Sequence, residues 1–177
     1  HGSQDDPAPT HPRPFFFPFR RKNANFAEIN TIRTDMGRLL SIDFGRKRCG
    51  IAVTDPLRIV ATGLTTIATA SLEKFVLDYI AREGVDAIIV GEPRDMQGRP
   101  SESQRFMRPA IARLRRVVPD NIPIEFYDER FTSVIAHRAM IDGGLPKMAR
   151  RDKALVDEMS ATIILNEYLQ SKQYTQQ

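Results

Sequence analysis

The sequence predicts an α/β protein built on a five-stranded mixed sheet with helices on both faces. Two strand-like segments, residues 38–44 and 48–54, are close enough in the chain to form an antiparallel hairpin. A short apolar run at residues 86–90 is typical of a buried parallel strand. Helical spacing alternates with such strands from residue 71 onward, and a helix between two strands makes a parallel crossover.

The remaining elements follow in a regular order. We expect a third strand at residues 59–67, antiparallel to the second, and then a helix that ends at Gly84. That helix spans residues 71–83, and the other expected elements are a polar loop at 91–100, a basic helix at 101–118, a strand at 122–127, a short helix at 131–141 and a final helix at 152–169.

Composition divides the chain near Met36. Residues 1–36 carry five prolines and no sustained periodicity, so we interpret them as a disordered or loosely packed extension that begins with a tag remnant. The rest of this segment is either a native extension, with phenylalanines that dock on the domain or on a partner, or sequence translated ahead of a natural start at Met36. Residues 37–172 are expected to form one domain, followed by a short tail at 173–177.

The net charge of +4 and the basic isoelectric point near 9.5 are compatible with a nucleic-acid partner. The single cysteine, Cys49, excludes an internal disulfide and favours a reducing cytoplasm. We find no apolar run long enough to span a membrane and no secretory signal pattern. The sequence thus predicts a cytoplasmic protein without a membrane partner.

Acidic residues follow the predicted strands where these end. Asp43 ends the first strand, Glu92 follows the fourth, and Asp128 and Glu129 follow the fifth. In open sheets ligands bind at the carboxyl ends of strands, and hydrolysis of phosphodiesters uses carboxylates that converge on divalent cations. We therefore expect a site for Mg²⁺ or Mn²⁺ here. Each acid also has a structural interpretation, such as capping a turn or, for Glu129, pairing with Arg130.

Asp157 completes the acidic set from the last predicted helix. Its helical neighbours are the apolar residues Ala161, Ile164 and Leu165. A carboxylate on the apolar side of a helix is costly unless it is paired or bound to a metal. Asp157 is thus a candidate metal ligand, although a bridge to a nearby arginine would also explain it.

Basic residues lie beside these acids. Arg46, Lys47 and Arg48 follow Asp43 in a tight turn and are suited to a phosphate backbone. The basic loop at residues 145–151, which follows two glycines, could close over a bound nucleic-acid strand. The candidate nucleic-acid contacts outside the turn are Arg130, Lys147, Arg150 and Arg151. The arginines of the helix at 101–118 are interpreted as a solvated face.

Four segments together resemble the YqgF family, also called RuvX: residues 41–53, residues 88–93 with Gly98, residues 128–133, and residues 153–169. The resemblance implies an RNase H-like fold and a metal-dependent nuclease that matures the 5′ end of the small-subunit ribosomal RNA precursor, 16S in bacteria. It implies that Asp43, Asp157 and either Asp128 or Glu129 bind the metal and act in catalysis.

The chain departs from the family pattern at Glu92, where many members are expected to have an apolar residue. Since RNase H-like enzymes often carry an acid on this strand, Glu92 is a further candidate metal ligand in place of Asp128 or Glu129.

Three function hypotheses remain open from the sequence. The first is a nuclease, acting on precursor ribosomal RNA or on DNA four-way (Holliday) junctions. The second is a non-catalytic nucleic-acid-binding factor of ribosome assembly. The third, an ATP-binding module, is disfavoured because the actin-like cleft needs two such domains. We expect a monomer or a weak homodimer.

Overall fold

The computed structural model describes residues 37–95, 97–128 and 132–175. The predictions made for the N-terminal extension, for Glu129 and for Arg130 therefore lie outside the described residues. In the described part no helix is long and apolar enough to cross a bilayer.

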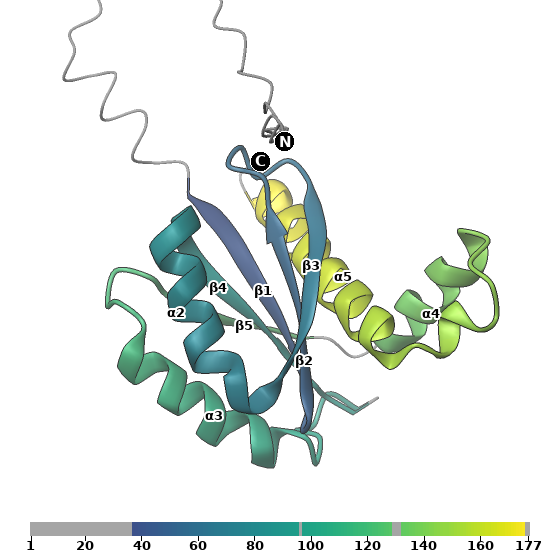
Figure 1. The fold of residues 1–177 in the computed structure, drawn as a ribbon, viewed down its shortest axis with the longest axis horizontal. Coiled ribbons are helices and arrows are strands. Elements are labelled where there is room, and N and C mark those ends of the chain that lie inside the picture. The colour runs from purple at the N-terminus through teal and green to yellow at the C-terminus, as the bar shows by residue number, and fades with distance from the viewer. Residues whose placement is uncertain (1–36, 96, 129–131, 176–177) are drawn as a thin grey trace, which may run out of the picture. The chain divides into compact units, whose positions relative to one another are not determined.

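Five strands form one mixed sheet in the order β3-β2-β1-β4-β5 (Figure 1). The antiparallel strands β1, β2 and β3 come first in the chain, and β4 and β5 then run parallel to β1. This arrangement confirms the predicted sheet. The bounds are β1 (Arg38–Phe44), β2 (Arg48–Thr54), β3 (Ala61–Ala68), β4 (Val85–Glu92) and β5 (Ile124–Asp128).

Helices cover both faces of the sheet, as predicted (Figure 1). The helices α2 (Leu72–Glu83) and α3 (Gln104–Val117) lie on one side, which we call the α3 face. The helix α5 (Lys153–Thr175) lies on the other side, the α5 face, and α4 (Thr132–Asp142) packs against it. Two short 3₁₀ turns, η1 (Thr69–Ser71) and η2 (Ala149–Arg151), precede α2 and α5. The helix α5 extends past residue 172, where we expected the domain to end.

The alternation of side chains along the strands divides the core in two. On β1, Leu40 and Ile42 point to the α3 face, where they pack with buried residues of α2 and α3. Leu39 points to the α5 face, and so does Ser41, which bonds to α5. Burying a side chain such as Leu40 stabilises the fold by roughly 1.5–3 kcal/mol. Cys49 belongs to the core, as predicted.

Candidate active site

Asp43 lies near the carboxyl end of β1, on the α5 face. It is two residues beyond Ser41, and its partner across the antiparallel pair is Gly50 of β2. The turn between these strands is tight at Gly45, since a Cβ there would lie 2.4 Å from the carbonyl oxygen of Arg48. The turn therefore fixes Asp43 beside the first residues of β2.

The backbone of α5 lies directly on β2 where Asp43 is paired. A Cβ on Gly50 would lie 1.9 Å from the carbonyl oxygen of Asp157, so glycine permits this contact. Two hydroxyls fasten the helix: Ser41 Oγ donates to the carbonyl of Ala161 at 2.7 Å, and Thr66 Oγ1 donates to that of Ala154 at 2.6 Å. Two of the predicted acids, from opposite ends of the domain, are brought together in this way.

The electrostatics of the site reflect the proximity of the two acids. Burial, and then the charge of Asp157, raise the pKa of Asp43 from its ordinary 3.8 to about 7. The Arg48 Nε donates to Asp157 Oδ2 at 3.0 Å. One carboxyl group of the site thus titrates near neutral pH, and the other is paired with a guanidinium.

The donor chemistry of this pair fits a hard divalent cation. Mg²⁺ is commonly held by one or two carboxylates, with waters and substrate phosphates as the other ligands. A cation between Asp43 and Asp157 would relieve the repulsion that, after burial, raises the Asp43 pKa. Across the described ranges, however, no cluster of three or more Asp, Glu, His or Cys side chains could hold a metal.

The structure places Glu92 away from this pair. On β4, Ile88 and Val90 belong to the α3-face core, and alternation directs Glu92 to the same side. Its carboxylate accepts hydrogen bonds from Arg94 Nε and Nη2 at 3.1 and 2.7 Å, and Arg108 Nη2 lies 3.5 Å away. The geometry therefore gives no support to Glu92 as a metal ligand. The presence of Arg94 two residues later in the sequence could have indicated that Glu92 forms an ion pair.

Asp128 lies beside Glu92 rather than beside Asp43. The two are register partners in the parallel pair of β4 and β5, and Asp128 Oδ2 is 4.0 Å from Arg94 Nε. Its neighbour Tyr127 packs instead with the α5-face core. The assignment of Asp128 to the metal site remains a sequence-based prediction, as does that of Glu129.

The basic residues of the turn divide between the two faces. Arg48 reaches Asp157 on the α5 face. Arg46 and Lys47 are exposed, and the Arg46 guanidinium carbon lies 4.7 Å from the centroid of the Phe106 ring on α3. Phe106 is not among the residues predicted from the sequence, although an aromatic residue on the solvated side of a predicted helix is a signal that could have indicated it.

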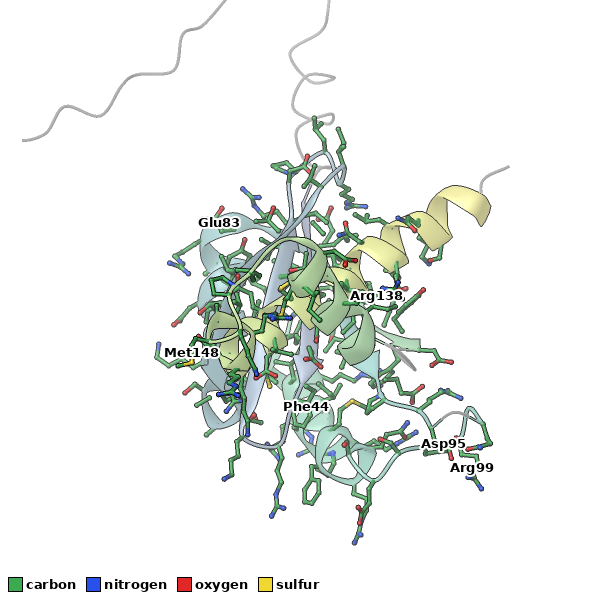
Figure 2. The ribbon with its side chains drawn as sticks, turned by 90° about the vertical axis from the view of Figure 1, so that its right-hand side faces the viewer. Phe44, Glu83, Asp95, Arg99, Arg138 and Met148 are labelled. Atoms are coloured by element: carbon green, nitrogen blue, oxygen red, sulfur yellow. The ribbon has the colours of Figure 1, made fainter. Side chains whose placement is uncertain are left out.

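The second basic group precedes α5, the helix that carries Asp157. Lys147 and Arg151 are exposed and Arg150 is half-buried, in the segment that Met148 marks in Figure 2. Within the described part of the chain, the Arg150 Nε is buried without a hydrogen-bond partner. The position of the segment is compatible with the predicted nucleic-acid contact, which stays a prediction.

The mixed sheet with α5 packed across its β1–β2 hairpin defines an α/β protein of the RNase H-like type. The *Thermus thermophilus* RuvC structure, solved with a Holliday junction substrate, matches 77% of this chain and 96% of its own with a TM-score of 0.50 and 20% identity, which is a likeness of fold. The family model RuvX, described as Holliday junction resolvase, matches residues 37–171. The chain belongs to the RuvX family.

Curated relatives agree with this assignment. A protein of *Phocaeicola vulgatus* is 57% identical over 139 residues, which are 78% of this chain and 99% of the relative. A protein of *Porphyromonas gingivalis* is 53% identical over 134 residues, 76% of this chain and 96% of that relative. Both are named as candidate pre-16S rRNA nucleases.

Proposed function

We propose that this protein is a metal-dependent nuclease that hydrolyses phosphodiester bonds in the precursor of 16S ribosomal RNA, in the cytoplasm. The observation that carries the proposal is the approach of Asp43 and Asp157 from distant elements, with the pKa of Asp43 raised to about 7. Family membership supports a nuclease, and the names of the relatives support the RNA substrate.

Asp43 and Asp157 are the residues that would hold Mg²⁺ or Mn²⁺. When bound, such a cation supplies Lewis-acid stabilisation of the phosphoryl oxygens and lowers the pKa of water. Asp43 must lose its proton to act as a ligand, so its affinity for the cation rises with pH until about pH 7 is passed. Arg48 orients Asp157 through the bond from its Nε. Arg46 and Lys47 offer exposed cations to the substrate phosphates.

A two-cation site needs a further carboxylate beyond this pair. Asp128 is directed to the face of Glu92 and Arg94, which disfavours it. We therefore propose Glu129 as the third ligand, on the sequence evidence alone. Comparing Glu129→Gln with Asp128→Asn in cleavage assays tests this choice: the Glu129 change is expected to cause the larger loss.

The decisive experiment is the substitution Asp43→Asn, assayed on labelled 16S precursor RNA with and without Mn²⁺. We expect cleavage to fall at least about 100-fold while RNA binding in EDTA is retained, since loss of a ligand removes metal chemistry but no basic residue. The matched control is Asp120→Asn, which changes an exposed acid outside the site. Undiminished cleavage by the Asp43 variant would disprove the proposal.

A second candidate function, resolution of DNA four-way junctions, is favoured by the description of the family and by the fold of RuvC. A resolvase needs two active sites, hence two copies of this chain, whereas we expect a monomer or weak homodimer. The same assay therefore includes a labelled junction, and symmetric cuts in the junction with an intact precursor would favour this alternative. Binding without any metal-dependent product would indicate a non-catalytic assembly factor.

A further inference from the structure

One aromatic side chain of α3 faces solvent beside the candidate site's basic turn. Met107, Ile111 and Leu114 are buried against the sheet, whereas Phe106 is 46% exposed. A single exposed apolar residue is common on protein surfaces and carries little by itself. Phe106 differs because the Arg46 guanidinium lies over its ring, at 4.7 Å from the centroid.

The turn that carries Arg46 joins the two faces of the sheet. Asp43 before it and Arg48 after it are directed to the α5 face, where they meet Asp157. Arg46 crosses to the α3 face and reaches Phe106. A nucleic-acid strand bound at the acidic pair can therefore continue around the turn onto α3 and stay in contact with positively charged side chains.

Further exposed cations lie on the same turn and on the same helix as the Arg46–Phe106 pair. We define the turn–helix surface as Arg46, Lys47, Arg105, Phe106 and Arg108. The side chains of Arg105 and Arg108 are 76% and 66% exposed, and both line a hollow of about 630 Å³ at the start of α3. Their acidic partners are Glu102, 3.8 Å from Arg105, and Glu92, which is already shared with Arg94. The surface therefore keeps an excess of positive charge.

This combination suits an unpaired nucleotide. Cations bind the phosphates of any nucleic acid, but the face of a base is available only where the base is not stacked in a helix. An aromatic ring next to arginine binds such a face by stacking and by cation–π attraction. A regular duplex would gain the phosphate contacts and leave the ring unused.

We propose that the Arg46–Phe106 pair is a stacking site for one unpaired nucleobase next to the cleaved bond, so that the enzyme prefers single-stranded substrate segments. The proposal rests on the proposed nuclease function and deepens it. Phe106 is a binding and specificity residue, and the acidic pair remains responsible for the chemistry.

Binding assays with a fluorescent single-stranded RNA of about ten nucleotides test the proposal on the full chain, in EDTA so that no cleavage occurs. Stacking on an aromatic side chain changes affinity by roughly 5- to 150-fold per base. Phe106→Leu is expected to weaken binding by this factor, and Phe106→Trp to retain it. The blunt duplex of the same sequence is expected to bind both variants like the wild type.

The chain offers a matched control on β5, where Phe126 meets Arg115 from the other end of α3. Phe126 is 39% exposed, and the Arg115 guanidinium lies 5.4 Å from its ring centroid, so it has the same chemistry away from the turn. Phe126→Leu is expected to leave binding unchanged. The salt dependence of binding distinguishes the role of Arg46 from that of Phe106. Arg46→Gln is expected to lower the slope of log affinity against log salt by about 0.7, and Phe106→Leu is expected to leave the slope unchanged.

A 2-aminopurine scan along the RNA locates the stacked base, because its fluorescence is quenched in the wild type at one position and restored in Phe106→Leu. The same binding assay with a single-stranded DNA of the same sequence shows whether the ribose 2′-hydroxyl contributes to affinity. Three outcomes would each overturn the proposal. Phe106→Leu could bind the single strand with wild-type affinity, or it could lose equal affinity for single strand and duplex. The third outcome is that the wild type does not bind the single strand. The cleavage result for Asp43→Asn is independent of all three, so failure of the nuclease function is distinguished.

Discussion

At the scale of single residues, Asp43 shows the conflict between folding and chemistry. Burial and the nearby Asp157 disfavour its charged form and raise its pKa to about 7. In the unfolded chain the same group has its ordinary pKa of 3.8. Between pH 3.8 and about pH 7, Asp43 is protonated more in the folded protein than in the unfolded one. Its contribution to the free energy of unfolding therefore decreases as pH rises. The cost is present in full above about pH 7.

We therefore predict that Asp43→Asn stabilises the metal-free protein in a pH-dependent way. The gain is expected to be near zero at pH 4 and to reach roughly 1–3 kcal/mol at pH 8, allowing for the partial solvent exposure of the site. Urea unfolding in EDTA from pH 4 to 8 measures it, with Asp120→Asn as the control whose effect does not vary with pH. Added Mn²⁺ at pH 8 should stabilise the wild type more than Asp43→Asn. A gain that is constant over the whole range would contradict the shifted pKa.

At the scale of secondary-structure elements, the site depends on how closely α5 approaches the sheet. Small residues make this approach possible: Ser41, Gly50 and Ala52 are buried beneath the helix, and Gly63 on β3 contacts the side chain of Glu158. The backbone of α5 at Asp157 therefore rests on the neighbour of Asp43 without an intervening side chain. The position of Asp157, a candidate metal ligand, is therefore set by the absence of a Cβ on Gly50 of β2.

A pair of glycine substitutions tests this dependence. In Gly50→Ala the new Cβ would meet the backbone of Asp157 at 1.9 Å, and a backbone cannot turn aside. We expect a loss of roughly 1–3 kcal/mol in the free energy of unfolding, and about 100-fold slower cleavage because the acids are displaced by an ångström or so. In Gly63→Ala the Cβ meets the Glu158 side chain, which can move, so both losses should be small. Equal effects of the two changes, measured by urea unfolding and RNA cleavage, would argue against the close-packing explanation.

The sequence was a sufficient guide to these elements and to part of the site. Periodicity predicted five strands and four helices to within about three residues, except that α5 ends six residues beyond its expected end, because the spacing of apolar residues reflects burial directly. It also indicated Asp157, since a carboxylate beside Ala161 and Ile164 needs a partner. It could not show which face each strand-end acid occupies. One residue of register changes the face, and Glu92 is two residues beyond Val90 and thus on the α3 face.

At the scale of the whole molecule, the sheet separates two charged groups at its carboxyl edge. The α5 face holds Asp43 and Asp157, and the α3 face holds the cluster of Glu92, Arg94 and Arg108. Arg94 also donates to the carbonyl of Gly98, which ties down the segment between β4 and α3 (Figure 2, where Asp95 and Arg99 mark it). The α3-face cluster thus orders a loop at the edge where substrate would pass.

Both cores, the acidic pair and the turn–helix surface are built from residues after Arg33, within the compact unit Thr34–Gln177. The *Phocaeicola vulgatus* relative is matched over 99% of its length by 78% of this chain, so that relative has almost nothing beyond this unit. We therefore predict that a chain starting at Met36 has the same melting temperature, within about 2 °C, and the same cleavage rate as the full chain. Thermal unfolding and the precursor assay measure the two quantities. A loss of cleavage at an unchanged melting temperature would show that the first 35 residues contribute to substrate binding, and a lower melting temperature would show that they complete the fold.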